Sequence, residues 1–220
     1  MSNHVIIVAG GSGKRMGSST PKQFLKLNNE VILMKSITAF YNFDTSVQII
    51  LALPKTHISL WSELCTKYRF TIGHSIAYGG KTRYQSVRNA LDVIKTNGTV
   101  AIHDGVRPLV SQQTLQRVFD AASKKGNAVP YIDIVDSIRF ADQGINKPVN
   151  RNNYKLIQTP QAFDCKLIKR AYQQKWEEAF TDDASVVEKL GVKINLVPGN
   201  RENIKITSQI DLKIAQALHS

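Results

Sequence analysis

The chain has 220 residues, a length that suits one α/β domain with a sizeable core. Its apolar content of 42% and charged content of 21% are ordinary for a soluble globular protein. The cysteines, Cys65 and Cys165, lie far apart without a CxxC or histidine-rich context, which argues against a disulfide framework or a zinc site. No apolar run approaches the roughly 18 residues needed to span a bilayer, and the first strand pattern begins too early for a signal peptide. We therefore expect a cytoplasmic protein without a membrane partner.

The net charge of +12 raises the question of nucleic-acid binding. The basic residues are spread along the chain, however, without a block of five or six and without interleaved stacking aromatics. Several of them stand next to glycines or in the motifs described below. This distribution favours a small anionic substrate over a nucleic acid, because a basic surface raises the association rate of phosphorylated ligands.

Strand and helix patterns alternate from the N-terminus onward. Apolar runs predict strands over residues 5–8, 47–53, 71–78, 100–103, 128–131 and 192–197. Helical spacing of apolar residues predicts helices over 87–94 and 115–122, with Ser111 as the N-cap of the second. A last helix is expected to start near Ser208, where Asp211 completes a pattern like a capping box. The alternation predicts a three-layer α/β fold with a mostly parallel twisted sheet covered on both faces.

Residues 134–158 interrupt the alternation. An apolar and polar alternation over 134–140, turn residues at 141–144 and a second extended stretch ending at Ile157 predict an inserted β-hairpin. We find no linker, repeat or low-complexity segment. The sequence therefore predicts a single domain over residues 1–220 with a projecting arm at about 134–158.

The stretch Gly10–Gln23, GGSGKRMGSSTPKQ, follows the first strand and is rich in glycines and cations. Glycine-rich loops after strands expose backbone N–H groups to polyphosphates. Arg15 stands where a P-loop needs Ser or Thr, and Met16 stands where a dinucleotide fingerprint needs a third glycine, so neither pattern fits. The alternative to a triphosphate site is an ordinary turn with solvated charges.

The wider motif set resembles a known family. Gly11-x-Gly13-x-Arg15-Met16 followed by Pro21-Lys22-Gln23 resembles the opening motif of the nucleotidylyltransferases of glycosyltransferase-A-like, Rossmann-like fold, and its ending is typical of their small cytidylyltransferase branch. Further motifs follow in the order of the 2-C-methyl-D-erythritol 4-phosphate cytidylyltransferases: His103-Asp104-Gly105-Val106-Arg107-Pro108, Gln158-Thr159-Pro160-Gln161, Thr181-Asp182-Asp183-Ala184-Ser185 and Asn203-Ile204-Lys205-Ile206-Thr207. The resemblance runs from about residue 4 to residue 218.

The resemblance implies roles for particular residues. Arg15 and Lys22 would be catalytic, holding the triphosphate and stabilising the transition state. The residues expected to bind CTP are Ala9, Gly10, Gly11, Gly13, Gly80, Ser86 and Lys205. The residues expected to bind the acceptor are Arg107, Ser137, Arg151, Thr181 and Lys205, and in the resembled family the arm that carries Ser137 and Arg151 exchanges between the subunits of a homodimer.

Asp104 follows a strand, and a carboxylate facing a phosphate site would repel the ligand unless a divalent cation lay between them. Mg²⁺ suits that place because it binds oxygen ligands and retains several waters. The alternative for Asp104 is an aspartate that caps its own turn. Arg107 is expected either to pair with Asp104 or to contact the acceptor phosphate, and His103 is expected to be structural.

Alternatives remain for other residues. Thr181 could cap a helix, bind the acceptor or share its hydroxyl between the two, and in a monomer Arg151 would be an exposed hairpin charge. The sequence also departs from the family, with Lys81 where relatives often carry an acidic residue and Ser137 where threonine is usual. We expect altered electrostatics but retained CTP preference.

The function implied by the resemblance is cytidylyl transfer from CTP to 2-C-methyl-D-erythritol 4-phosphate, giving 4-diphosphocytidyl-2-C-methyl-D-erythritol and pyrophosphate in non-mevalonate isoprenoid biosynthesis. A ribitol-5-phosphate cytidylyltransferase shares several motifs and is the nearest alternative. A catalytically silent nucleotide-binding regulator and a basic RNA-binding module are the candidates from other classes.

Overall fold

A computed structural model describes residues 2–11 and 20–218 of the chain. Its helices are α1 (Ile32–Phe43), α2 (Ile58–Lys67), α3 (Arg83–Val93), α4 (Gln112–Lys125), α5 (Cys165–Ala171), α6 (Asp183–Glu188) and α7 (Gln209–Leu218), with 3₁₀ helices η2 (Lys22–Phe24), η3 (Lys55–His57) and η4 (Arg151–Asn153). Its strands are β1 (Ser2–Val8), β2 (Lys26–Leu27), β3 (Glu30–Val31), β4 (Gln48–Leu53), β5 (Ser75–Tyr78), β6 (Gly98–Asp104), β7 (Asn127–Asp133), β8 (Arg139–Asp142), β9 (Ile145–Pro148), β10 (Lys155–Ile157), β11 (Gln161–Asp164) and β12 (Leu196–Pro198).

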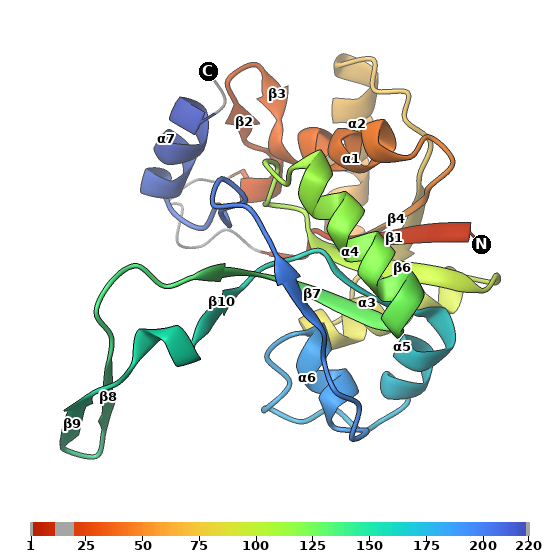
Figure 1. Cartoon of the computed structure of the whole chain (residues 1–220). Helices are drawn as coiled ribbons and strands as arrows, with labels where there is room; N and C mark the ends of the chain where they lie inside the picture. Colours follow the sequence, from red (N-terminus) through yellow and green to blue (C-terminus); the bar gives the residue numbers. More distant parts are fainter. Residues whose placement is uncertain (1, 12–19, 219–220) are drawn as a thin grey trace.

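The central sheet has eight strands in the order β10-β7-β11-β6-β1-β4-β5, with β12 paired to β7 (Figure 1). Strands β6, β1, β4 and β5 are parallel, whereas β11 runs antiparallel to both β6 and β7. The chain leaves β1 for β4 on one side and returns to β6 on the other. A crevice therefore opens between β1 and β6 at their carboxyl ends, which is the place where α/β sheets bind ligands.

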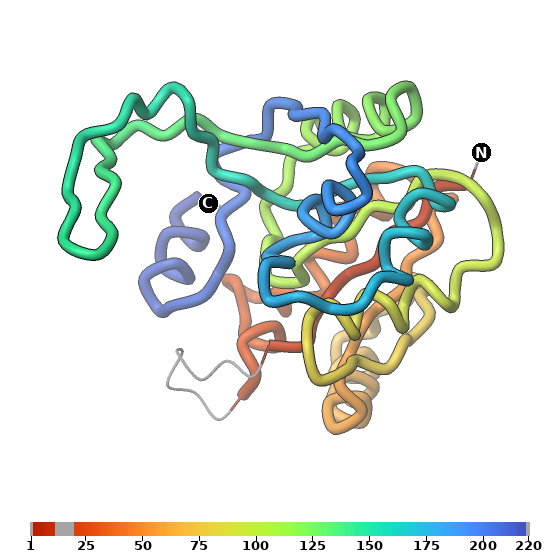
Figure 2. Tube along the Cα trace, turned by 90° about the horizontal axis from the view of Figure 1, so that it is seen from below, coloured from red at the N-terminus to blue at the C-terminus, as the bar shows by residue number. Residues whose placement is uncertain are grey.

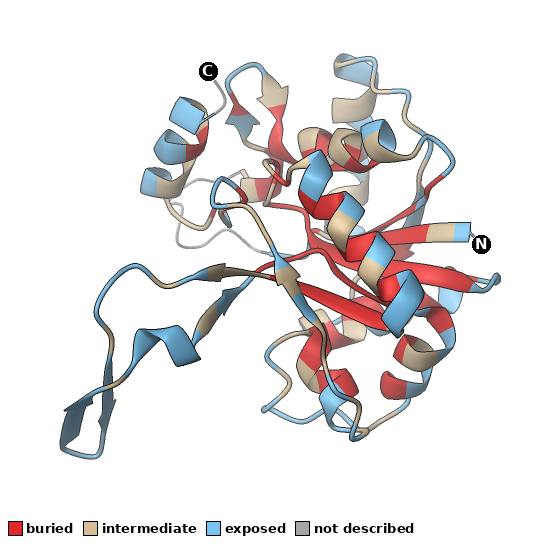
Figure 3. Ribbon diagram, viewed as in Figure 1, coloured by how far each residue is buried: buried red, intermediate tan, exposed pale blue. Residues whose placement is uncertain are grey.

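Helices cover both faces of the sheet, as the alternating pattern predicts. One cluster joins β1, β4 and β6 to α1, α2 and α4, and includes Leu51, Phe40 and Trp61. The second joins the opposite sheet face to α3, α5 and α6, and includes Ile6 and Tyr172. Figure 3 shows the sheet strands largely buried between the two layers. The three-layer α/β fold with a mostly parallel sheet is confirmed.

Local sequence signals explain several helix ends. The Ser111 hydroxyl accepts a hydrogen bond from the Thr114 N–H, which confirms Ser111 as the N-cap of α4. The Ser208 and Asp211 side chains accept hydrogen bonds from each other's backbone N–H groups at the start of α7. The prediction of Thr181 as a helix cap is wrong. Asp182 caps α6, since its carboxylate accepts from the Ser185 N–H and forms a capping box.

Other differences concern short strands. The strand predicted over 71–78 begins later, as β5 (Ser75–Tyr78). Of the strand predicted over 192–197, only the last two residues belong to a strand, β12 (Leu196–Pro198). Strands β2, β3 and β11 are absent from the predicted set because each has only two to four residues. The described residues include no helix long and apolar enough to cross a membrane.

The arm extends away from the sheet, on the same side of the molecule as α7 (Figures 1 and 2). Its base is the antiparallel pair β7–β10 and its tip is the hairpin β8–β9, so the predicted extended stretches are interrupted rather than continuous. Gln143 and Gly144 both have positive φ, as a two-residue turn of this hairpin requires. Every residue of β8 and β9 is exposed.

Candidate active site

The first cavity lies at the carboxyl ends of β1 and β6. The strand register places Val8 opposite Asp104, and this brings the chain after β1 next to the end of β6. The cavity has a volume of about 300 Å³. Its lining residues come from the end of β1, from η2, from the start of α3, from β6 and from the segment before α7: Val8, Ala9, Gly10, Gly11, Lys22, Gln23, Gly80, Lys81, Thr82, Arg83, Ser86, Asp104, Val106 and Lys205.

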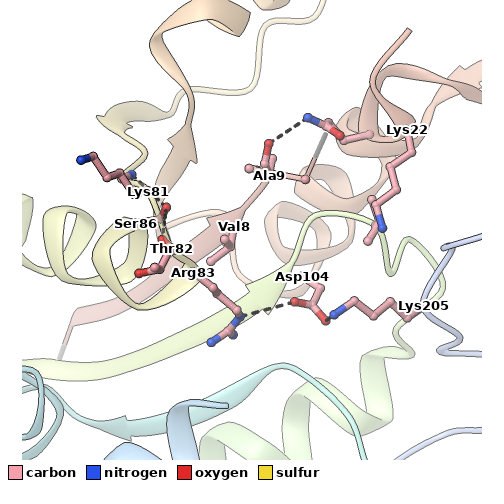
Figure 4. Close-up of a pocket in the computed structure, with 14 residues that line it drawn as sticks. Val8, Ala9, Lys22, Lys81, Thr82, Arg83, Ser86, Asp104 and Lys205 are labelled. Atoms are coloured by element: carbon pink, nitrogen blue, oxygen red, sulfur yellow. Dashed lines mark hydrogen bonds and ion pairs between the residues drawn. The ribbon is translucent and has the colours of Figure 1, made fainter. Parts of the chain in front are cut away.

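Lys22 is positioned by the two residues that follow it. Pro21 precedes a 3₁₀ turn in which Gln23 and Phe24 are buried. The Gln23 amide donates to the carbonyl oxygen of Ala9 at 2.9 Å, and the Phe24 ring stacks on Trp61 with centroids 6.2 Å apart. The Lys22 stem passes over Gly11, because a Cβ built at Gly11 would lie 3.3 Å from the Lys22 Cε. The turn thus anchors two side chains in the core and leaves Lys22 extending along the cavity (Figure 4).

The start of α3 forms another wall. The Gly80 N–H donates to the Ser86 hydroxyl at 3.0 Å, and that hydroxyl donates to the Thr82 carbonyl oxygen at 2.9 Å. The Thr82 side chain caps α3 by accepting from the Gln85 N–H. A Cβ at Gly80 would lie 2.1 Å from the Gln85 Cγ, so only glycine fits there without displacing the helix start. Since Ser86 is already hydrogen-bonded on both sides, its hydroxyl holds the Gly80 loop and retains only acceptor capacity for a ligand.

Asp104 is a buried carboxylate among three cations. Its Oδ2 atom lies 3.1 Å from the Arg107 Nε. The Lys205 Nζ lies 3.1 Å from the same oxygen, and the Arg83 Nε lies 3.8 Å from Oδ1 (Figure 4). Burial raises the pKa of Asp104, but Arg83, Lys205 and Arg107 outweigh it and hold that pKa well below its usual value. Asp104 is therefore a carboxylate near neutral pH.

The pairing prediction for Arg107 is confirmed. Besides its contact with Asp104, the Arg107 guanidinium donates to the Asn203 carbonyl oxygen at 2.8 Å. Among the described residues, no backbone N–H of the following turn donates to the Asp104 side chain, so Asp104 does not cap its own turn.

A second cavity, of about 210 Å³, adjoins the first. Thr181, Asp182 and Arg107 are among the residues that line it. The two cavities share Arg83, Asp104 and Lys205. A triphosphate in the first cavity and an acceptor phosphate in the second would therefore meet beside the cations of Arg83 and Lys205, and cations offset the repulsion between two anions.

His103 holds two residues next to this junction through hydrogen bonds. Its Nε2 atom lies 3.0 Å from the Arg107 carbonyl oxygen and its Nδ1 atom 3.1 Å from the Thr159 hydroxyl, whose oxygen also accepts from the Asp104 N–H. Complete burial lowers the pKa of His103 to about 4, against the raising effect of its hydrogen bond to Arg107. His103 is thus neutral and structural, in agreement with its predicted role.

The stability of the fold should depend on pH through His103. Because its pKa falls from 6.5 to about 4 on folding, the unfolded chain binds a proton first as pH decreases. We expect this contribution to be complete above pH 6.5 and to decrease by about 3 kcal/mol toward pH 4. Urea unfolding at each pH measures it. His103→Gln should flatten the slope in this interval, and an unchanged slope would contradict the assignment.

The predicted site residues fall into three groups. Ala9, Gly10, Gly11, Lys22, Gly80, Ser86, Asp104 and Lys205 line the first cavity, and Arg107, Thr181 and Lys205 line the second. Ser137 and Arg151 lie on the arm and line neither cavity. The predictions for Gly13 and Arg15 fall outside the described residues.

Sequence reasoning did not assign several residues that shape the site. Gln23 and Thr159 stood within quoted motifs, but nothing in those motifs shows that they hold Ala9 and Asp104. Arg83, the first residue of α3, has no role among the predicted site residues. Lys81 lies at the cavity edge and extends away from Asp104 in Figure 4, so the departure from the family at this position leaves the junction unchanged.

A divalent cation could be held at the junction. The described residues contain no group of three or more His, Cys, Asp or Glu side chains suited to a metal. Mg²⁺ commonly needs only one or two carboxylates, with substrate phosphates and water as the other ligands. The ionised Asp104 beside a triphosphate-sized cavity fits that donor set.

Comparison with known proteins defines the family. Residues 3–220 match the family described as 2-C-methyl-D-erythritol 4-phosphate cytidylyltransferase. The chain belongs to this family. A protein of that name from Phocaeicola vulgatus is 51% identical over 218 residues, which cover 99% of this chain and 100% of the relative. One from Bacteroides thetaiotaomicron is 46% identical, with coverage of 99% and 100%.

Solved structures of family members share the fold. The 4-diphosphocytidyl-2C-methyl-D-erythritol synthase from Anaerococcus prevotii superposes with a TM-score of 0.85 at 27% identity, covering 99% of this chain and 96% of the other. The 2-C-methyl-D-erythritol 4-phosphate cytidylyltransferase from Thermus thermophilus gives a TM-score of 0.81 at 29% identity, covering 99% and 98%. Membership in this family of cytidylyltransferases makes the chain an enzyme.

Proposed function

We propose that the chain transfers a cytidylyl group from CTP to 2-C-methyl-D-erythritol 4-phosphate, giving 4-diphosphocytidyl-2-C-methyl-D-erythritol and pyrophosphate. The observation that carries the proposal is the junction of two cavities at Arg83, Asp104 and Lys205. Family membership supports the reaction, and we assign it to the junction.

In this reaction an acceptor phosphate oxygen attacks the α-phosphorus of CTP, a P–O bond forms, and the bond to pyrophosphate breaks. The acceptor phosphate is ionised near neutral pH, so no protein nucleophile is needed. The chain instead brings two anions together and stabilises the charge that develops at phosphorus. We assign the triphosphate to Lys22 and the Gly10 side of the first cavity, and the acceptor phosphate to Lys205, Arg107 and Thr181.

We assign Mg²⁺, or another divalent cation, to the first cavity with Asp104 as its protein ligand. When bound, it would neutralise triphosphate charge and bring the phosphate oxygens next to Asp104. Arg107 and Lys205 keep the carboxylate ionised and oriented for this role.

Pyrophosphate release tests the substrate assignment. With CTP and Mg²⁺ present, we expect release on addition of 2-C-methyl-D-erythritol 4-phosphate and much slower release with D-ribitol 5-phosphate. Equal or faster pyrophosphate release with D-ribitol 5-phosphate would contradict the assigned acceptor, whereas the assignment of cytidylyl transfer would stand. If the protein bound CTP but released no pyrophosphate with either acceptor, the result would favour a nucleotide-binding protein without catalytic activity.

We also propose a homodimer in which the arm of each subunit completes the other's site. The arm exposes large apolar side chains: Val135, Phe140, Ile145, Tyr154, Leu156 and Ile157. Pairing of Asp142 with Ile145 puts Phe140 and Ile145 on one face of the β8–β9 hairpin. An isolated two-stranded hairpin is marginally stable in water, so a second subunit is the expected cover for this face.

Complementation tests completion in trans. Arg151→Ala and Lys22→Ala should each be inactive alone. A mixed dimer would hold one site with both defects and one with neither, so an equimolar mixture should recover about a quarter of wild-type activity if subunits exchange freely. Co-purification of differently tagged subunits verifies exchange. No recovery despite exchange would place Arg151 and Lys22 in one chain's site and contradict the trans arrangement.

The remaining predictions concern organisation and location. We propose one nucleotidylyltransferase domain with the arm at about 134–158, a division that is supported by clusters packed on a single sheet. A cytoplasmic location and the lack of a nucleic-acid partner stay predictions. Cell fractionation tests the first, and RNA retention at low salt tests the second.

A further inference from the structure

Asp183 is a fully buried carboxylate that lines neither cavity. Its oxygens accept two hydrogen bonds from the Arg83 guanidinium, from Nη1 at 2.8 Å and from Nη2 at 2.6 Å. The Tyr172 hydroxyl donates to the Asp183 Oδ1 at 2.6 Å. The bidentate geometry fixes the plane of the guanidinium as well as its charge.

The partners that hold this contact are themselves fixed. Tyr172 is 2% exposed, and its ring stacks on Tyr84 with centroids 4.7 Å apart. Asp183 opens α6, where the Asp182 capping box sets the backbone. The Tyr172 hydroxyl and the Asp183 carboxylate therefore present a rigid receptor to Arg83, which reaches from the cavity wall across 100 positions of sequence.

This arrangement affects the Asp104 carboxylate. Arg83 stops with its Nε atom 3.8 Å from Asp104 Oδ1, which is beyond hydrogen-bond distance. Arg107 and Lys205 both contact the other oxygen, Oδ2. Within the described part of the chain, Oδ1 therefore accepts no hydrogen bond, although a guanidinium stands next to it.

We propose that Asp183 and Tyr172 are positioning residues that hold Arg83 back from Asp104, so that Oδ1 stays available to the divalent cation accompanying CTP. If the charge of Asp183 were removed, Asp104 would be the nearest remaining carboxylate for Arg83. The guanidinium would then move onto Oδ1 and compete with the metal. This inference rests on the proposed function, since it assumes that a cation binds with CTP at Asp104.

The test is calorimetric titration of CTP into the protein, with saturating Mg²⁺ and again with EDTA, without acceptor. The ratio of the two affinities measures the metal contribution apart from turnover. We expect Asp183→Asn to reduce this ratio by about tenfold, the scale seen when groups that orient metal ligands are changed. Tyr172→Phe, which keeps the ring and removes only the hydroxyl that donates to Asp183, should reduce this ratio less.

The double variant Asp183→Asn/Arg83→Gln separates competition from damage to the fold. It removes the competing cation together with its partner, so the ratio should return most of the way to the wild-type value. A folded Asp183→Asn protein with the wild-type ratio, or a double variant no better than Asp183→Asn, would overturn the inference alone if the wild type still forms product. A wild type whose CTP affinity ignores Mg²⁺ would overturn the inference and the metal assignment together. Circular dichroism and melting curves report folding for each variant.

Discussion

Lys22→Ala should lower kcat by about a hundredfold or more, which corresponds to the loss of one preorganised contact to charge that develops in the transition state. The η2 turn should survive the change, because Gln23 and Phe24 rather than Lys22 anchor it in the core. We therefore expect a nearly wild-type melting temperature together with the loss of rate. Steady-state kinetics and thermal unfolding of the same preparation measure both.

Lys26→Ala is the matched control for this variant. Lys26 belongs to β2, is exposed, and lies over the Tyr68 ring outside the cavity. It should retain wild-type activity. Near-native turnover of Lys22→Ala would contradict a catalytic role for Lys22 and would leave the Gly10–Gln23 loop as an ordinary turn.

Asp104→Asn should impair both catalysis and folding. The amide keeps the shape of the side chain but leaves Arg83, Arg107 and Lys205 facing a neutral group, and breaking a buried ion pair typically costs about 3–5 kcal/mol. Because Lys205 is half exposed, we expect the lower end, about 3 kcal/mol of unfolding free energy. The rate should fall by about a hundredfold and the Mg²⁺ activation curve should shift to higher concentration.

The exposed residue Asp92 in α3 provides the control, and Asp92→Asn should change neither stability nor rate. If Asp104→Asn kept the wild-type rate and the wild-type Mg²⁺ activation curve, Asp104 would have a structural role rather than a role in metal binding. A stability loss without a rate loss would assign it to the fold alone.

The sequence predicted those parts of the fold that depend on local pattern. The apolar runs that form β1 and β6 and the helical spacing in α4 each contain their own signal, because buried strands and amphipathic helices differ in period. The Ser111 cap is equally local. Strand β11 was not predicted, since its four residues form a strand only between β6 and β7.

The residues of the site could be predicted from motifs, but their arrangement in space could not. The motifs contained Lys22, Asp104 and Lys205, yet only the strand register brings Val8 opposite Asp104. The contact between Arg83 and Asp183 joins residues 100 positions apart and leaves no periodic signal. The role that we propose for Arg151 requires a second subunit, and the sequence of one chain does not specify how two subunits pack.

Phosphorus-31 NMR of the product tests the central claim most directly, because the claim is that two phosphates are joined where the cavities meet. With CTP, Mg²⁺ and 2-C-methyl-D-erythritol 4-phosphate, the wild type should convert the acceptor monophosphate signal into two mutually coupled diphosphate signals, with an equal amount of pyrophosphate. Release of pyrophosphate with CMP while the acceptor signal stays unchanged, or no change in either substrate, would contradict the account.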